Sequence, residues 1–535
     1  MTPDVAELPA PQRHRDLSFY LVLFTVIIPF CSVAPLSWLF LIYTFRYHIS
    51  CFFSWPSCLI VAVALSEALF SIYYYRLALR ISRLRPSDQG DVLEIQTAFR
   101  RLLKSGLAGL PTDGGDEESL HTIRPGSPNE TITQLERDDP RAIDFRNSLR
   151  TWFQRATWSS ICLGEMQRWI FWSIYNADMP PFEQLSQSQR NVIDEAVEQL
   201  KMRTGCNIPQ GSNPRNIPMC LTIDPIKFNW RPLTFYTLIA IVNRYIRRWF
   251  MDRYLIKYGS HMGLEYLIRV PTAWNNASEL RPVLFIHGLG LGLFQYYLFL
   301  RHLLDTVKDR PVLILLQPQI SQDIFHPQFL EPLDRRQTIE KLTSLLTELG
   351  WVTRSSDKDD FGNSEDEVKS HSPSTCKAGG ITVLSHSNGS YTHAWLLKDC
   401  PKIVTRSCFV DPVTFCSWEG DVCYNFIYRT PVTGAELLMQ YFVSTELGVA
   451  NLLQRHFDWA SNSLWYEEIP NARDPSKARF LLGGKDAILN SERIIRYLRS
   501  HGVNKGIWYD PQGCHGEPLM IGGPGHNEIL KWLNE

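Results

Sequence analysis

Two long apolar runs lie near the beginning of the chain. Residues 18–45 contain no charged side chain, and residues 49–75 contain one, Glu67. A helix of about 20 apolar residues spans the hydrocarbon core of a bilayer, so each run is long enough to cross a membrane. The pattern therefore predicts a hairpin of two transmembrane helices within residues 1–85, joined by a tight turn at residues 46–48. A pair of buried core helices is the alternative.

Arginines flank this hairpin on both sides. Two precede it, four follow it and one lies in the turn: Arg13 and Arg15, then Arg76, Arg80, Arg83 and Arg85, and in the turn Arg46. Because positive residues favour the cytosolic side of a membrane, both ends of the hairpin are expected to face the cytosol. Glu67 lies near the end of its predicted helix, and we expect it to have a structural role.

The next part of the chain, residues 86–259, has mostly helical patterns. A basic amphipathic stretch comes first, and a polar segment at about residues 112–141 is predicted to be a disordered linker. Residues 231–258 open with a mostly apolar stretch and continue with arginines between aromatic residues. This composition is typical of a helix at a membrane surface, or of a long helix that packs on the following domain with its arginines in solvent.

From about residue 260 the pattern changes to short apolar runs that alternate with helical stretches. Alternation of this kind predicts an α/β domain over residues 260–535, with a mostly parallel sheet flanked by helices. Two long connections interrupt the alternation. Residues 354–380 are polar and charged and are predicted to be a disordered insertion, whereas residues 412–478 are predicted to form a helical lid.

Composition limits the kinds of partner. The 54 Lys and Arg residues nearly balance the 55 Asp and Glu residues, so nothing suggests a nucleic acid. The twelve cysteines form no CxxC pair and no Cys/His cluster at metal-ligand spacing. We therefore expect reduced thiols and no structural zinc; no metal site is predicted.

One predicted strand ends in a glycine-rich loop. The apolar run PVLFI is followed by His287, Gly288 and LGLG. A sharp bend at the carboxyl end of a strand can direct backbone N–H groups towards a carbonyl oxygen, as an oxyanion hole requires. A dinucleotide-binding loop is the alternative, but HGLGLG departs from G-x-G-x-x-G and the next strand ends without a suitable acidic residue.

A second predicted strand ends in a serine. In ITVLSHSNGS, a buried strand, a turn and a helix follow one another, which is the order of a nucleophile elbow with Ser387 at its tip. The amide of Asn388 then points into the space beside the serine. Glycines normally stand two residues to either side of the nucleophile. Gly389 is present, and the small residue Ser385 takes the other place. A loop serine without catalytic function is the alternative.

A serine nucleophile needs a base, and the base needs an acid that orients it. Asp486 follows the strand FLLGG in a loop, and His515 follows the last predicted strand. Each has a rival. Asp411 ends the strand SCFV and could also orient the base, and His526 precedes the closing helix. We favour Asp486 as the acid and His515 as the base, and expect the rivals to be structural.

The predicted lid is rich in aromatic side chains. They include Phe415, Trp418, Tyr424, Phe426, Tyr428, Tyr441, Phe442, Trp459, Trp465 and Tyr466. An aromatic lid over the serine favours an apolar acyl or lipid-like small molecule as the substrate. The alternative is that a helical lid needs these side chains for its own core.

Together, the motifs PVLFIHGLG, VLSHSNGS, GGKDAI and GCHGE resemble those of the α/β-hydrolase superfamily, of the AB hydrolase-1 type. The whole chain also resembles fungal membrane-anchored α/β-hydrolase domain proteins, through SEALFSIYYYR, LRTWFQRA and RPLTFY. The first resemblance implies that Ser387 is the nucleophile, His515 the base and Asp486 the acid. It also implies that the backbone amides of Leu289 and Asn388 stabilise the oxyanion.

The resemblance further implies hydrolysis, or transfer, of an acyl ester through an acyl-enzyme and without a cofactor. Epoxide and haloalkane hydrolases of this fold need an aspartate at the position of Ser387, so hydrolysis of epoxides and haloalkanes is disfavoured. A catalytically inactive membrane scaffold is one alternative, and a peptidase or thioesterase of the same fold is another. With both hairpin ends in the cytosol, the hydrolase domain is expected on the cytosolic face of an endomembrane, anchored in the lipid bilayer.

Overall fold

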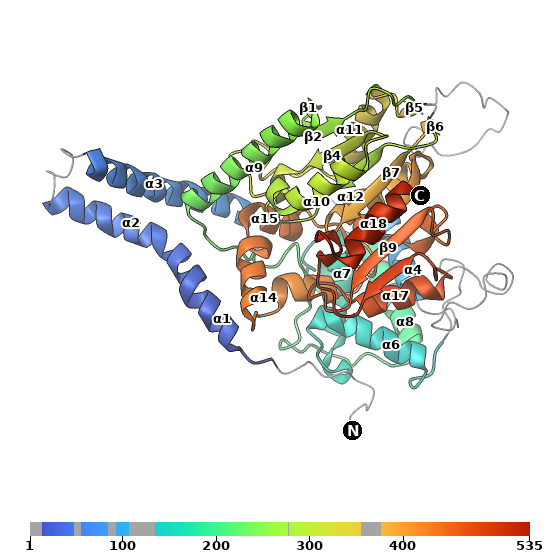
Figure 1. Cartoon of the computed structure of the whole chain (residues 1–535). Helices are drawn as coiled ribbons and strands as arrows, with labels where there is room; N and C mark the ends of the chain where they lie inside the picture. The colour runs from blue at the N-terminus through green and yellow to red at the C-terminus, as the bar shows by residue number, and fades with distance from the viewer. Residues whose placement is uncertain (1–12, 48–54, 84–91, 106–133, 277, 355–375) are drawn as a thin grey trace.

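The computed structural model describes most of the chain (Figure 1). The described residues are 13–47, 55–83, 92–105, 134–276, 278–354 and 376–535. Most of the linker predicted at about residues 112–141, and most of the insertion predicted at residues 354–380, lies outside them.

An eight-stranded sheet forms the centre of the domain, in the order β1-β2-β4-β3-β7-β8-β9-β10. The strands are β1 (Lys257–His261), β2 (Leu264–Arg269), β3 (Val283–Ile286), β4 (Val312–Leu316), β7 (Ile381–His386), β8 (Val404–Val410), β9 (Ala478–Gly483) and β10 (Ile507–Asp510). β2 pairs antiparallel with β1 and with β4, and all other neighbours are parallel. The prediction of a mostly parallel sheet is confirmed. A separate antiparallel pair is formed by β5 (Val352–Arg354) and β6 (Cys376–Gly379).

Helices cover both faces of the sheet. They are α9 (Leu233–Tyr254), α10 (Leu293–Thr306) and α18 (Pro524–Asn534) on one face, and α11 (Arg335–Glu348), α12 (Gly389–Asp399) and α17 (Ser491–Ser500) on the other. Alternate strand residues point to opposite faces. On β3, Val283 and Phe285 pack with the first set of helices, and Leu284 and Ile286 pack with the second. The central strands are therefore buried on both faces, as is usual for parallel sheets.

The helices between residues 92 and 204 pack on the sheet domain. They are α4 (Val92–Lys104), α6 (Pro140–Leu149), α7 (Leu163–Tyr175) and α8 (Gln187–Thr204). Phe99 of α4 and Trp169 of α7 belong to the same hydrophobic cluster as α12 and α17. The indole N–H of Trp459 donates to the carbonyl of Ser173 on α7 at 2.7 Å. The helical region and the sheet domain thus share one core.

Two N-terminal helices project from this core, and each is long and apolar enough to cross a membrane (Figure 1). The first comprises α1 (Leu17–Val22), the π-helical η1 (Leu23–Ile27) and α2 (Ile28–Tyr47), and the second is α3 (Trp55–Arg83). Only 17% of the most apolar stretch of the first helix and 28% of that of the second are buried. Core helices, the alternative considered from the sequence, would be mostly buried. The turn predicted at residues 46–48 does not include Arg46 and Tyr47, because α2 continues through Tyr47. Residues 48–54 lie outside the described residues.

The two helices separate towards the domain and contact different parts of it (Figure 1). Phe19 of α1 packs against Leu437 of α14 (Gly434–Met439), which belongs to the predicted lid. Phe70, in the second half of α3, packs against Tyr236 of α9 with ring centroids 5.9 Å apart. One leg of the hairpin therefore contacts the lid, and the other contacts the helix that precedes the sheet.

Candidate active site

A sharp turn between β7 and α12 presents Ser387 at the carboxyl end of the strand. Ser387 has a φ of 50°, a left-handed conformation that is uncommon for a residue with a side chain and stores backbone strain. Its N–H donates to the carbonyl of Val410 at 3.0 Å, which ties the turn to the neighbouring strand β8. The residue is 8% exposed. This backbone has the strained strand-to-helix geometry of a nucleophile elbow.

Two glycines let the surrounding backbone approach Ser387. A Cβ at Gly389 would lie 2.4 Å from the carbonyl oxygen of Ile286, and a Cβ at Gly288 would lie 2.8 Å from the Cβ of Ser387. Neither position has room for a side chain, so glycine is needed at both. The loop that follows β3 is thereby brought against the elbow.

Ser385, which takes the place of the elbow's other glycine, is buried and hydrogen-bonded. Its Oγ lies 2.9 Å from Nδ1 of His393, and Nε2 of that ring lies 3.0 Å from Oγ of Ser407. The ring also stacks on Phe409, with centroids 4.2 Å apart. Burial lowers the pKa of His393 to about 3, so the ring is neutral and can bridge two hydroxyl groups. Ser385 and His393 therefore connect the elbow to β8.

Three of the predicted residues meet at the elbow. Nε2 of His515 lies 2.8 Å from Oγ of Ser387, and Nδ1 of His515 lies 2.5 Å from Oδ2 of Asp486. The other oxygen of Asp486 accepts the N–H groups of Ile488 at 2.7 Å and Leu489 at 3.1 Å. Because Nδ1–H donates its hydrogen bond to the carboxylate, Nε2 is left as the acceptor that faces the serine hydroxyl.

Neighbouring charges set the proton affinity of His515. Burial alone would disfavour the imidazolium, but the carboxylate of Asp486, assisted by that of Asp411, outweighs it and raises the pKa of His515 above its usual value. The same carboxylate that orients the ring therefore also stabilises the positive charge that forms when the ring takes a proton.

Asp411, the rival acid, uses both of its oxygens on backbone groups. Oδ1 accepts the N–H of Gly483 at 3.1 Å, and Oδ2 accepts the N–H of Gly516 at 2.7 Å. Burial, together with the negative charge of Asp486, raises the pKa of Asp411. Asp411 thus joins the end of the strand before Asp486 to the loop that carries His515, whereas Asp486 is the direct partner of the ring.

His526, the rival base, lies in a different place. Its Nε2 is 3.2 Å from Nδ1 of His302, and its ring packs edge-on against Phe299. Both partners belong to α10, so His526 joins α18 to α10. The structure does not bring it to Ser387.

The two backbone amides expected to form an oxyanion hole lie on the loops that meet at Ser387. Asn388 follows the serine directly, and Leu289 follows Gly288, which approaches the serine closely. Within the described part of the chain, neither N–H has an acceptor. Both donors are therefore free to bind a substrate oxygen.

Tyr296 contacts the elbow and was not predicted from the sequence. The hydroxyl of Tyr296, on α10, accepts the N–H of Gly288 at 2.9 Å and lies 2.7 Å from Nδ1 of His386. It links the glycine-rich loop to the residue before the nucleophile. No motif marks Tyr296 in the sequence, and its position becomes meaningful only once α10 packs behind that loop.

Donor atoms of Asp411, Asp486 and His515 all lie within 4.8 Å of one another, a spacing that could also hold a metal ion. The hydrogen bonds already described account for this cluster, because Asp486 binds the ring and Asp411 binds two backbone N–H groups. We therefore interpret it as the acid side of a Ser-His-Asp arrangement.

The region predicted to be a lid, residues 412–478, is built from short helices. They are α13 (Asp421–Cys423), η9 (Tyr424–Tyr428), α14, η10 (Gln440–Ser444), α15 (Leu447–Arg455) and α16 (Trp459–Asn462). None of the ten aromatic residues named for the predicted lid is exposed. Trp418 stacks on Trp465 at 4.2 Å, and Phe415 packs against Phe480 of the sheet. Eight of the ten belong to the core shared with the sheet, and Tyr441 and Phe442 pack with α1. The aromatic content of this region therefore says nothing about the substrate.

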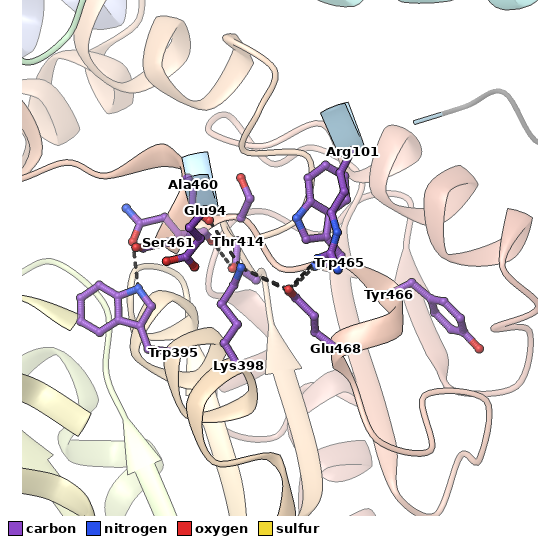
Figure 2. A network of polar contacts seen from close by, with 12 residues as sticks. Glu94, Arg101, Trp395, Lys398, Thr414, Ala460, Ser461, Trp465, Tyr466 and Glu468 are labelled. Carbon is purple, nitrogen blue, oxygen red and sulfur yellow. Dashed lines mark hydrogen bonds and ion pairs between the residues drawn. The ribbon is translucent and has the colours of Figure 1, made fainter. Parts of the chain in front are cut away.

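A cavity of about 370 Å³ lies apart from the Ser387 site, and its lining includes residues of α4, α12 and α16. Three of its charged side chains pair with one another (Figure 2): Glu468 lies 2.8 Å from Arg101 and 3.3 Å from Lys398. Burial lowers the pKa of Lys398. These pairs connect the helical region to the sheet domain, and we assign the cavity a structural role.

The strand order, with an antiparallel edge followed by parallel strands, defines an α/β-hydrolase fold. Ser387, Asp486 and His515 follow the ends of β7, β9 and β10, in the chain order that this fold requires. The fold class predicted from the sequence is therefore confirmed.

No protein-family model matches the chain, and no curated protein matches its sequence. Among solved structures, it is similar to a membrane phospholipase A described as a bacterial virulence factor, with 14% identity, a TM-score of 0.31, and coverage of 56% of this chain and 93% of that one. It is also similar to the carboxylesterase CesB from Bacillus subtilis, with 11% identity, a TM-score of 0.30, and coverage of 55% and 98%. Similarities this low add no argument about function. The likeness to fungal membrane-anchored proteins stays a prediction.

Proposed function

We propose that the protein is a membrane-anchored serine hydrolase that cleaves, or transfers, an acyl ester of an apolar or lipid-like compound. One observation carries this proposal. A hydrogen-bonded chain runs from Asp486 through His515 to Ser387, with distances of 2.5 and 2.8 Å. This is the arrangement that a serine needs to lose its proton as it attacks a carbonyl carbon.

In the first half of the reaction, Oγ of Ser387 attacks the ester carbonyl while Nε2 of His515 takes the hydroxyl proton. Asp486 keeps the ring oriented and stabilises the imidazolium. The N–H groups of Leu289 and Asn388 bind the oxyanion of the tetrahedral intermediate. The imidazolium then protonates the leaving alkoxide, and the acyl group remains on Ser387.

In the second half, His515 removes a proton from a water molecule, which attacks the acyl carbon. The imidazolium returns the proton to Oγ of Ser387 as the carboxylic acid leaves. An alcohol in place of water gives acyl transfer. Each of these steps uses only side chains and backbone groups of this chain.

We assign the anchoring to α1, α2 and α3. Their length and apolar composition fit a hairpin in a bilayer. The arginines on the outer sides of the hairpin favour a cytosolic position for the domain, on an endomembrane. The apolar substrate follows from this location, because esters with long acyl chains concentrate in the bilayer.

An inactive scaffold is the alternative that a serine in place of the first elbow glycine suggests. The hydrogen bond between Ser385 and His393 argues against this alternative, because it explains a serine in place of glycine at position 385 without requiring a loss of function. A peptidase or thioesterase would use the same three residues, so only the choice of substrate separates it from an esterase.

Hydrolysis of a substrate series tests the proposal. The purified full chain is assayed on 4-nitrophenyl esters of short and long acyl chains, on an acyl thioester and on a peptide anilide. We expect cleavage of the esters, faster for longer chains, and none by Ser387→Ala. Ser500→Ala, at the end of α17, is the control and keeps full activity. Equal ester cleavage by Ser387→Ala would exclude the proposed nucleophile.

A further inference from the structure

Glu67 connects the second apolar helix to α9. It is 1% exposed, although it lies within a stretch of α3 that is long and apolar enough to cross a membrane. Its two carboxylate oxygens accept the N–H groups of Leu233 and Thr234, each at 2.8 Å. These are the first two N–H groups of α9, which have no acceptor within the helix. α9 therefore starts at the depth of Glu67 along α3.

The outward face of α9 changes character along the helix. Leu238, Ile241 and Tyr245 lie three or four residues apart, so they form one stripe, and they are 58% to 69% exposed. The same stripe continues with the exposed residues Arg248 and Asp252. The apolar part of the stripe is thus nearest to α3, and the charged part is farthest from it.

α10 repeats this change beside α9. Phe294 and Leu298 are 47% and 55% exposed, and Arg301 and Asp305 follow on the same face. The helices run in parallel and in register, because the N–H of Phe294 donates to Asn243 at 2.9 Å and the hydroxyl of Tyr254 donates to Asp305 at 3.0 Å. The apolar ends therefore form one surface patch, consisting of Leu238, Ile241, Tyr245, Phe294 and Leu298. The charged ends form its border.

The length of α3 accounts for the position of that border. A hydrocarbon core of about 30 Å corresponds to about 20 helical residues. Counted from Trp55, where α3 begins, this length reaches Tyr75, so Glu67 lies about 12 Å inside the nearer boundary. α9 starts at that depth and runs away from the Trp55 end of α3 (Figure 1). A rise of about 12 Å carries it to Ile241, just before its first charged residue, Arg244.

We propose that the apolar patch of α9 and α10 inserts into the lipid bilayer next to the hairpin. Its deeper part, Leu238 and Ile241, lies in the hydrocarbon, and its outer part, Tyr245, Phe294 and Leu298, lies at the level of the lipid headgroups beside Arg244 and Arg248. The inference rests on the proposed anchoring of the hairpin. Since α10 directly follows the glycine-rich loop beside Ser387, this position would place the entrance of the active site at the membrane. A substrate acyl chain would then enter from the bilayer rather than from water.

Fluorescence quenching at single labelled cysteines tests this depth. The full chain, with its other reactive cysteines replaced, is placed in nanodiscs of phosphatidylcholine and phosphatidylserine and labelled at one position with an environment-sensitive dye. Leu238→Cys and Phe294→Cys probe the patch, and Asp252→Cys probes its border. Leu39→Cys on α2 probes the hairpin, and Glu340→Cys on α11 is the control on an exposed face. Quenching is measured with a spin-labelled lipid and with aqueous iodide.

We expect the label at Leu238 to be quenched by the lipid as strongly as the label at Leu39 and to be shielded from iodide. The label at Phe294, in register with Asn243, should be quenched by the lipid less strongly and be partly shielded from iodide. The labels at Asp252 and Glu340 should show the opposite behaviour. If the patch labels behave like Glu340 while Leu39 is quenched by lipid, the inference is wrong and the anchoring stands. If Leu39 is also accessible to iodide, the proposed anchoring fails together with it.

Discussion

Separate replacement of Asp486 and Asp411 by asparagine distinguishes the two buried carboxylates of the site. Asp486→Asn removes the carboxylate that accepts the hydrogen bond from Nδ1–H of His515. The new amide can instead donate to Nδ1 and favour the tautomer with the proton on Nε2, which cannot act as the base. In a serine protease the corresponding change lowers kcat by about 10⁴-fold. We expect a loss of kcat/KM of that order for Asp486→Asn.

Asp411→Asn should mainly affect stability. Its remaining carbonyl oxygen can serve one of the two backbone N–H groups, of Gly483 or Gly516, and the other loses a charge-assisted hydrogen bond. Such a bond contributes about 1.5–3 kcal/mol to the free energy of unfolding. Since His515 keeps its partner Asp486, kcat/KM should fall much less than in Asp486→Asn.

The pH dependence of kcat/KM is a second, independent way to distinguish the two carboxylates. His515 acts as a base only when neutral, so activity rises with pH through its pKa. Asp411 contributes to the raised pKa of His515, and removal of its charge lowers that pKa. The acid limb of the Asp411→Asn profile should therefore move to lower pH.

Both variants are measured by kcat/KM on a chromogenic ester over a range of pH and by thermal unfolding in detergent. Asp411→Asn should unfold at a lower temperature and remain active, whereas Asp486→Asn should be nearly inactive. If Asp411→Asn lost as much activity as Asp486→Asn at every pH without loss of stability, Asp411 would be the acid and the present assignment would be refuted.

Three further predictions concern the scaffold. Glu67→Ala removes two charge-assisted hydrogen bonds, which should lower the free energy of unfolding by about 3 kcal/mol or more. Thermal unfolding measures this loss against the exposed control Glu340→Ala. Equal unfolding midpoints for the two variants would contradict the contact between Glu67 and α9. Gly389→Ala places a Cβ 2.4 Å from the carbonyl of Ile286, so we expect loss of the folded elbow and of activity, and an active, stable variant would argue against this geometry. Asn276 is exposed in a glycosylation sequon, and a cytosolic domain predicts a glycosidase-insensitive mass in a eukaryotic host, whereas an attached glycan would place the domain in a lumen.

Much of the fold could be predicted because its strands are short, buried on both faces and separated by helices. Ser387, Asp486 and His515 could be grouped because each follows a strand, and parallel strands end at the same edge of the sheet. Asp411 also follows a strand end, so sequence reasoning left it as a rival. Only the loop positions distinguish the two acids, because they bring Asp486 to the ring and Asp411 to backbone N–H groups.

Contacts between distant parts of the chain could not be predicted. Glu67 is 166 residues from Leu233, and no local pattern indicates that it would meet the first turn of α9. Tyr296 gains its role only from the packing of α10. The aromatic residues of the lid show a related limit, because composition indicates apolar side chains but not whether they line a cavity or fill a core.

The central claim is that Ser387 is a nucleophile activated by His515. The most direct measurement is reaction of the purified full chain with a fluorophosphonate probe, followed by mass spectrometry of its peptides. The account predicts one phosphonylated residue, Ser387, and little or no labelling in His515→Ala, while Ser500→Ala is labelled like the natural sequence. Folded protein that stays unlabelled, or that carries the label on another residue, would contradict it.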